Sequence, residues 1–368
     1  MSELTAKRIV LTVINDLNYD QRMIRICNSL VDEGYKVTLV GRENPKSKPL
    51  EKRRFHQKRI KVNRASGKMM YFIYWVKLFF YLLQKKADVF CATDLDSILS
   101  VYFASIIKGT KRVYDGHELF TEMKEVVTRP KEKAMWEWIE RFTLPRFPIG
   151  YTIGDYYAGY FQKKYGLNYE VIRNATVLKP LIREEPEEPF ILYQGAVNEG
   201  RCFEELIPAM QFVNHRLVVC GDGNFYQKAI DLANKYNVTD RIVFKGYVNV
   251  QELSNYTKKA HVGITLFDAY GLSNELSLAN RYFDYMHFAV PQLAMDYPEY
   301  KKINNEFEIA YLIPKPTIEL ISEGLNKLMG DPIYHQKLKE NTWKAREKYC
   351  WQNEEKKLIK FYKTHFPD

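Results

Sequence analysis

The sequence predicts an α/β protein made of two Rossmann-like, doubly wound domains that face each other across a cleft. Three observations support this fold class. The chain has 368 residues, about twice the usual size of a single domain. Short apolar runs alternate with longer segments of helical period through both halves. A proline- and glutamate-rich interval, 174–189, interrupts this alternation as an exposed linker would.

The first half contains five expected strands with helical sequence between them. The strands are Arg8–Ile14, Lys36–Val40, Asp88–Cys91, Arg112–Tyr114 and Gly150–Ile153. Between the first two, Gln21–Glu33 places Ile24 and Leu30 on one face of a helix. The apolar segment Met69–Leu83 is shorter than the ~20 residues that span a bilayer and includes Lys77. We interpret it as a core helix or as a surface that rests against a membrane leaflet.

The second half repeats this alternation with six expected strands. They are Phe190–Gln194, Arg216–Cys220, Ile242–Phe244, Val262–Thr265, Pro291–Ala294 and Ile309–Leu312. The sequence therefore predicts a first domain over 1–178, a linker over 179–189, a second domain over 190–345 and a terminal helical segment over 346–368. Ligands of such folds bind at the carboxyl ends of the strands, so we expect a site between the two domains.

Charge is distributed unevenly along the chain. The net charge is +10, with +14 in residues 1–183 and −4 in the remainder. The segment Lys52–Lys68 holds eight basic residues and no acidic one. It suits an anionic membrane surface or an anionic acceptor, because each cation adds about 1 kcal/mol at such a surface; a solvated basic loop is the alternative. Nucleic-acid binding is disfavoured because no RNA-binding motif accompanies the charge and the second half is acidic.

The amino terminus and the cysteines indicate a cytoplasmic protein. The opening MSELTAKRIVLTVIND lacks the apolar stretch and cleavage site of a secretory signal. The five cysteines are scattered and form no C-x-x-C pair, so we expect reduced, buried thiols and no metal site. We expect a cytoplasmic location, with the inner face of the cytoplasmic membrane as the alternative.

The segment Leu278–Pro291, LANRYFDYMHFAVP, has polar groups on one face of a predicted helix. Asn280 and Asp284 are four residues apart and Arg281 lies three before Asp284, so the three side chains are neighbours. A carboxylate can accept two hydrogen bonds from a ribose diol, while Asn280 and Arg281 at the helix start can meet a diphosphate. An ordinary amphipathic helix with a wet polar face is the alternative.

Two further segments combine strand ends with polar groups. In FILYQGAVNEGRCFEELIPAM, Gly195 and Gly200 allow the backbone to approach a phosphate, and Arg201 stands at the helix entrance. In VYDGHELFTEM, three ionisable groups follow a strand and could orient a sugar or accept a proton. These three are Asp115, His117 and Glu118.

The segment LANRYFDYMHFAVP is similar to the PNKLFEYxxAGxPV segment of retaining glycosyltransferases of family 4, which have the GT-B architecture. In that family the acidic residue of this segment binds the donor ribose, and Asp284 takes its position. A second family Glu lies eight residues earlier, where this chain has Leu276. Its neighbour Glu275 is the candidate substitute.

Other segments carry the same resemblance. Aligning LIPAM with the L-I-x-A-F of the family places Arg201 on the phosphate-binding lysine and Ala196 on the arginine. Arg281, or Arg22 from the first domain, is then the candidate for the missing cation. The loop in VFKGYV abuts the nucleobase in the family, which makes Tyr247 and Val248 base-pocket candidates. WQNEEKKLIKFY, within 346–368, resembles the closing helix that crosses back to the first domain.

The resemblance implies a glycosyltransferase that moves a sugar from a nucleotide-diphosphate sugar to a glycan or lipid-linked acceptor. It implies retention of configuration and a role in surface polysaccharide or glycoconjugate synthesis. We expect no cofactor and no metal, and we favour a UDP-sugar over a GDP-sugar. Expected partners are the donor, the acceptor and an anionic membrane surface, without nucleic acid. The alternatives are a nucleotide-sugar epimerase of the same fold and a catalytically silent paralogue that binds nucleotide sugars.

Overall fold

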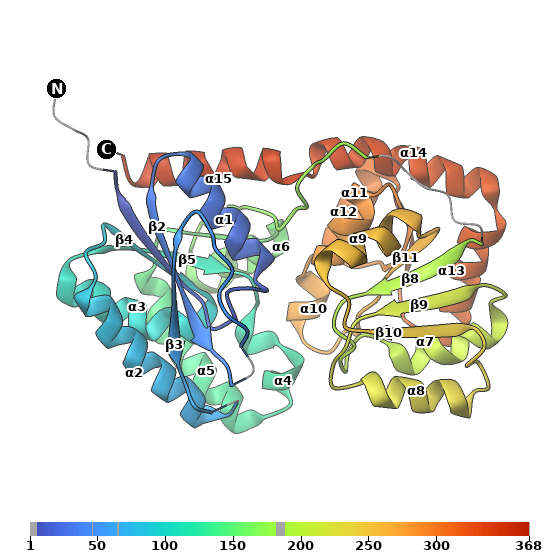
Figure 1. Cartoon of the computed structure of the whole chain (residues 1–368), viewed down its shortest axis with the longest axis horizontal. Coiled ribbons are helices and arrows are strands. Elements are labelled where there is room, and N and C mark those ends of the chain that lie inside the picture. The colour runs from blue at the N-terminus through green and yellow to red at the C-terminus, as the bar shows by residue number, and fades with distance from the viewer. Residues whose placement is uncertain (1–5, 46, 65, 182–187, 368) are drawn as a thin grey trace. The chain divides into compact units, whose positions relative to one another are not determined.

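The computed structural model describes residues 6–45, 47–64, 66–181 and 188–367 (Figure 1). The chain divides into two compact units. The first unit extends to Arg173 and resumes at Glu355, and the second comprises Asn174–Glu354. The sequence placed the first boundary at 178, five residues beyond this division. The part of the expected linker at 182–187 lies outside the described residues.

The first unit contains a seven-stranded parallel sheet of order β3-β2-β1-β4-β5-β6-β7. Helices α2, α3 and α5 lie on one side of this sheet and α1 and α15 on the other (Figure 1). Its elements before Arg173 are β1 (Arg8–Thr12), α1 (Gln21–Asp32), β2 (Lys36–Glu43), β3 (His56–Lys61), α2 (Lys68–Gln84), β4 (Val89–Thr93), α3 (Asp94–Lys108), β5 (Lys111–Gly116), η1 (Phe120–Glu122), α4 (Lys124–Val127), α5 (Pro130–Thr143), η2 (Leu144–Arg146), β6 (Gly150–Thr152), α6 (Asp155–Tyr165) and β7 (Glu170–Val171).

The second unit contains a six-stranded parallel sheet of order β10-β9-β8-β11-β12-β13. Its elements are β8 (Phe190–Gln194), α7 (Phe203–Ala209), η3 (Met210–Phe212), β9 (Arg216–Cys220), α8 (Tyr226–Lys235), β10 (Ile242–Gly246), α9 (Val250–Lys259), β11 (Val262–Thr265), α10 (Leu272–Leu276), α11 (Asn280–His287), β12 (Gln292–Met295), α12 (Pro298–Phe307), β13 (Ala310–Ile313), α13 (Ile318–Gly330) and α14 (Pro332–Lys348). The last helix, α15 (Trp351–His365), begins in this unit and continues in the first, so the expected terminal helix starts at Trp351 and not at 346.

The two sheets confirm the predicted pair of Rossmann-like domains. In each sheet the strand order reverses at one point, between β1 and β4 in the first unit and between β8 and β11 in the second. The loops that follow these strands therefore leave the same edge of the sheet and diverge, which opens the position where α/β folds bind ligands. Arg22 follows β1, and Gly195, Arg201, Arg281 and Asp284 follow β8 or β11, whereas the candidates near Asp115 and Tyr247 lie at the ends of the neighbouring strands β5 and β10.

The sequence failed to predict two strands of the first unit. β3 (HQKRIK) pairs with β2 over Thr38–Glu43, although the segment Lys52–Lys68 had been interpreted as a basic cluster or loop. Only Ile60 of β3 is buried, because the strand lies at the edge of the sheet and faces water. β7 has two residues, too few for a pattern to reveal it.

Helix α2 has two faces of different environment. Met70, Tyr74, Leu78 and Leu82 are buried in the first unit, as expected for a core helix. The opposite face is apolar but exposed to solvent. No helix among the described residues has both the length and the apolar character needed to cross a bilayer.

Candidate functional site

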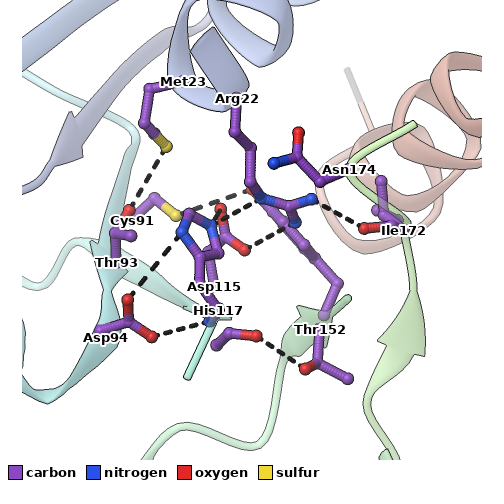
Figure 2. Close-up of polar contacts among 12 residues, drawn as sticks. Arg22, Met23, Cys91, Thr93, Asp94, Asp115, His117, Thr152, Ile172 and Asn174 are labelled. Carbon is purple, nitrogen blue, oxygen red and sulfur yellow. Dashed lines mark hydrogen bonds and ion pairs between the residues drawn. The ribbon is translucent and has the colours of Figure 1, made fainter. Parts of the chain in front are cut away.

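The first unit places a buried ion pair at the end of β5. Asp115 is completely buried, and its Oδ1 lies 3.0 Å from Nη2 of Arg22, the second residue of α1 (Figure 2). Arg22 Nη1 donates a hydrogen bond to the carbonyl of Ile172 at 2.9 Å. Burial raises the pKa of Asp115, but Arg22 and His117 lower it below its ordinary value. The guanidinium of Arg22 thus has partners within the first unit, where the sequence suggested a diphosphate contact.

His117 lies against this ion pair. Its Nε2 is 2.8 Å from Asp115 Oδ2 and 2.7 Å from Arg22 Nε (Figure 2). Nε2 can donate to Asp115 only when it carries a proton and accept from Arg22 only when it does not. Burial and Arg22 lower the pKa of His117, but the carboxylates of Asp115 and Asp94 together raise it above its ordinary value. A change in the proton on Nε2 therefore changes which neighbour holds the ring.

Asp94 fixes the loop that carries His117. It is the first residue of α3, directly after the fully buried strand β4, and its φ is +54°. Its Oδ1 accepts hydrogen bonds from the backbone N–H of His117 at 2.7 Å and of Glu118 at 3.1 Å. Burial raises the pKa of Asp94 to about 6, against the lowering effect of His117. An aspartate with a left-handed backbone conformation and a buried carboxyl group is strained, and the surrounding structure maintains that strain.

The three catalytic candidates of the first unit therefore differ in their environment. Asp115 is enclosed, His117 is partly accessible, and Glu118 is exposed on the loop beyond them. Asp115 is shielded by Arg22 and by the imidazole of His117, so of these three side chains only His117 and Glu118 are accessible to solvent. Sequence reasoning singled out all three but missed the role of Asp94, which was visible only as part of an Asp-Leu-Asp triplet after a strand.

Arg281 is the central cation of the second unit. It is the second residue of α11 and only 9% exposed. Its guanidinium lies over the rings of Tyr193, at 4.4 Å from the centroid, and Phe267, at 5.2 Å. Its Nη1 is buried and has no hydrogen-bond partner among the residues that the structure describes. A buried N–H without a partner is costly, which is the expected condition of an anion site.

Glycines bring the backbone close to this cation. Gly195 follows β8 with a φ of +116°, and a Cβ there would lie 3.5 Å from Arg281 Nη2. A Cβ on Gly221, which follows β9, would lie 1.8 Å from the carbonyl oxygen of Gly195. The two loops can pack together because Gly221 has no side chain, and the positive φ of Gly195 favours glycine there as well. Gly221 N–H also donates to the carbonyl of Gly246, which connects the loop after β10 to the same cluster.

Arg201 contacts the same aromatic ring as Arg281. Its guanidinium lies 4.5 Å from the centroid of Phe267, so Arg201 and Arg281 both contact this ring. Gly200, with a φ of +83°, and Cys202, with a φ of +57°, turn the chain from the loop into α7. The structure thus brings together the two arginines that the sequence assigned to a diphosphate. It also adds Tyr193 and Phe267, whose place at strand ends was the only sequence signal.

Asp284 lies next to this cluster. Its Oδ1 accepts a hydrogen bond from Thr176 Oγ1 at 2.7 Å, and its Oδ2 accepts one from Gln194 Nε2 at 3.2 Å. These two bonds orient the carboxylate of Asp284 beside β8. Asn280 is exposed, and its side-chain oxygen accepts a hydrogen bond from Asn174.

The remaining candidates lie on neighbouring loops. Glu275 is half-buried in the short helix α10. Tyr247 is exposed and Val248 is half-buried in the loop after β10, which Gly246 connects to Gly221. Ala196, which replaces the arginine of the family, accepts a hydrogen bond from the Tyr193 hydroxyl through its carbonyl.

Two Rossmann-like units, each with polar groups beside the position where its strand order reverses, are typical of the GT-B class of enzymes. The family comparisons agree with this class. Residues 178–345 match the family described as glycosyl transferases group 1, and residues 21–178 match glycosyltransferase family 4. The chain belongs to the family 4-like glycosyltransferases with the GT-B fold.

Individual relatives are distant. An uncharacterized glycosyltransferase of Methanocaldococcus jannaschii is 25% identical over 187 residues, which are 49% of this chain and 46% of that protein; the chain thus matches about half the length of this curated relative. Sucrose-phosphate synthase from Thermosynechococcus elongatus superposes with a TM-score of 0.83 at 14% identity, over 98% of this chain and 99% of the other. HepE of Anabaena, solved in complex with UDP-glucose, gives 0.76 at 11%, over 97% and 100%. At these identities the structural likeness shows the fold alone.

Proposed function

We propose that the protein transfers a sugar from a nucleotide-diphosphate sugar to a glycan or lipid-linked acceptor in the synthesis of surface polysaccharides or glycoconjugates. The observation that carries this proposal is Arg281, a buried cation with an unused N–H beside the Gly195 loop. A diphosphate provides the acceptor atoms and the negative charge that this site lacks.

Arg281 and Arg201 would hold the diphosphate and stabilise the charge that develops on it as the sugar leaves. Asp284 would accept hydrogen bonds from the ribose diol, and Tyr247 and Val248 would line the base. We favour uridine as the base, supported by the UDP-glucose that the similar HepE structure contains. We also propose that no metal or cofactor is needed, because two guanidinium groups already supply positive charge there.

His117 would face the sugar and the acceptor, with Asp115, Arg22 and Asp94 holding its ring and its loop. Retention of configuration follows from the resemblance to retaining enzymes, with the acceptor attacking on the face that the leaving group vacates. We place the reaction in the cytoplasm, with a lipid-linked acceptor at the inner leaflet.

The test begins with nucleotide binding. In a thermal-shift panel of UDP, GDP, ADP and CMP, a bound nucleotide raises the apparent melting temperature by mass action. We expect UDP to give the largest shift. Asp284→Ala should remove most of it, whereas Asp296→Ala, which removes a surface carboxylate of the same unit paired with Lys301, should not. An equal shift in Asp284→Ala would exclude the ribose assignment.

Turnover decides between transfer and the alternatives. Incubation with UDP-sugars and a panel of glycan and lipid-linked acceptors should release UDP only when an acceptor is present, and chelation with EDTA should leave the rate unchanged. Epimerisation of the donor without acceptor would indicate a nucleotide-sugar epimerase. Tight binding without turnover on any acceptor would indicate a silent paralogue.

A further inference from the structure

Helices α2 and α3 form an exposed apolar face on the first unit. The two helices lie side by side (Figure 1), and Trp75 Nε1 donates a hydrogen bond to the carbonyl of Asp96 between them. The large exposed residues of α2 recur every three or four positions and so share one side of the helix. We call the exposed residues of both helices the α2–α3 face: Met69, Phe72, Val76, Phe80, Phe103, Ile106 and Ile107.

The packing of α2 against the sheet does not require this face. The buried stripe of α2, which includes Tyr74 and Leu78, already attaches the helix to the sheet. Phe72 and Val76 lie two residues from Tyr74, about 200° around the helix, and so point away from the core. The exposed side chains are 39% to 58% accessible on α2 and 46% to 65% on α3. Several apolar side chains exposed to this degree on two neighbouring helices are typical of an interaction site.

The charges within α2 and the segment before it are of one sign, although Glu132 of α5 pairs with Lys68 at the start of α2. From Lys52 to Lys86 the sequence has 11 basic residues and no acidic one. Arg53, Arg54, Arg59 and Lys68 of this segment form ion pairs, so half of the basic cluster Lys52–Lys68 is already neutralised. The cations next to the face are different residues: Lys77, Lys85 and Lys86 of α2 and its end, and Lys61 of β3, whose carbonyl accepts a hydrogen bond from Lys77 Nζ.

We infer that the α2–α3 face binds an anionic phospholipid surface, with its apolar side chains in the headgroup–acyl boundary and its lysines on the phosphates. Apolar area together with a cationic border is the combination that holds a helix in the plane of such an interface. This inference deepens the proposed function: of the two segments that the sequence offered for a membrane contact, Lys52–Lys68 and Met69–Leu83, it assigns the contact to the second and extends it to α3. It does not depend on which sugar is transferred.

The test uses vesicles and a pair of surface substitutions. Wild-type protein should float with vesicles of phosphatidylcholine containing 30% phosphatidylglycerol, float much less with pure phosphatidylcholine, and dissociate at 0.5 M salt. Phe72→Ser with Phe80→Ser should lower the partition coefficient on the order of tenfold or more. Serine and phenylalanine have similar helix propensities, so α2 should persist. Phe212→Ser, which alters an equally exposed phenylalanine of the second unit, is the matched control and should float like the wild type.

A second pair of variants tests the lysines. Lys85→Gln with Lys86→Gln should weaken flotation several-fold, whereas Lys301→Gln with Lys302→Gln, an exposed pair in the second unit, should not. A label at Phe80→Cys gives a direct readout, since all five native cysteines are buried. An environment-sensitive fluorophore there should shift to the blue on anionic vesicles.

Three results would overturn the inference. One is flotation that is unaffected by Phe72→Ser with Phe80→Ser, and another is no flotation of the wild type at all. The third is a change from dimer to monomer in that variant without vesicle binding, which would assign the face to self-association. The UDP-induced thermal shift is measured on the same proteins. If that shift is intact while flotation fails, only the membrane inference is wrong, and the converse result would contradict the proposed function alone.

Discussion

The two units each bury an arginine beside the carboxyl ends of their strands, and the two guanidinium groups are in opposite electrostatic conditions. Arg22 is paired with the fully buried Asp115, and its nitrogens contact His117 and Ile172. Arg281 has aromatic rings beside it, and one of its nitrogens has no hydrogen-bond partner among the described residues. Removal of one member of a buried ion pair leaves the other charge uncompensated and destabilises the fold, whereas a buried cation without an anionic partner is suited to bind an anion.

The largest expected difference between the two arginines is the effect of their removal on the free energy of unfolding. Arg22→Met leaves Asp115 as a buried carboxylate without its cation and should lower the free energy of unfolding by about 3–5 kcal/mol. The measurement is urea unfolding, with Arg22→Met/Asp115→Leu as the companion variant. The double variant should lose much less than the sum of the two single changes. Equal and additive losses would show that the two side chains act independently.

The next effect in size is a dependence of the stability of the first unit on pH, through Asp94. The pKa of Asp94 is raised by burial to about 6, so the folded state holds this proton more tightly than the unfolded chain does. Stability from this group is therefore present below pH ~4 and is lost as the pH rises to about 6, by roughly 2–3 kcal/mol.

Asp94→Asn removes this titration while retaining an oxygen that accepts the N–H groups of His117 and Glu118. Asparagine also tolerates the positive φ at this position. Relative to the wild type, the variant should gain about 2–3 kcal/mol between pH 4 and pH 7 in urea titrations. A constant difference across this range would mean that Asp94 is ionised throughout.

Arg281→Met should leave stability within about 1 kcal/mol of the wild type, because methionine removes a desolvated charge from an apolar surrounding. Binding of UDP should weaken about 10- to 100-fold, as expected for a lost hydrogen bond to a charged group. Calorimetric titration measures the binding and urea unfolding the stability. A strongly destabilised Arg281→Met protein would remove the contrast with Arg22.

The last comparison concerns the glycine contact of the second unit. Gly221→Ala would place a methyl group against the carbonyl of Gly195 and should cost about 1–3 kcal/mol of stability together with part of the UDP affinity. Gly159→Ala in α6 is the control, because its Cβ would meet nothing within 4 Å and alanine favours the helix by roughly 0.5–1 kcal/mol. Unchanged UDP affinity in Gly221→Ala would show that the loop position does not matter to the ligand.

Much of the fold could be predicted because its strands are buried on both faces. β8, β9 and β11 have the bounds that the apolar runs indicated. β3 could not be predicted, since an edge strand facing water needs no apolar period. The two faces of α2 could not be separated either, because nearly every residue of that helix is apolar and only the packing shows which ones are exposed.

The candidate site divides in the same way. Arg281 and Asp284 were found because they lie three residues apart in one helical segment, and Arg201 because it stands at a helix entrance after a glycine-containing loop. The partners of Arg22 could not be found, since Asp115 is 93 residues away and the contact exists only after β5 joins the sheet. Asp94 was missed for the same reason, because its two hydrogen bonds are made to a loop that follows a different strand.

The first unit is completed by the last residues of the chain. Phe361 and Tyr362 of α15 are buried, and their rings lie 5.1 Å and 6.4 Å from that of Tyr151. On the ribosome the whole second unit must be made between Arg173 and Glu355, which takes roughly 10–40 s at the usual rates of elongation. During that time Tyr151 has no cover from α15. The first unit, whose synthesis begins before that of the second, therefore completes its fold only after α15 has been made.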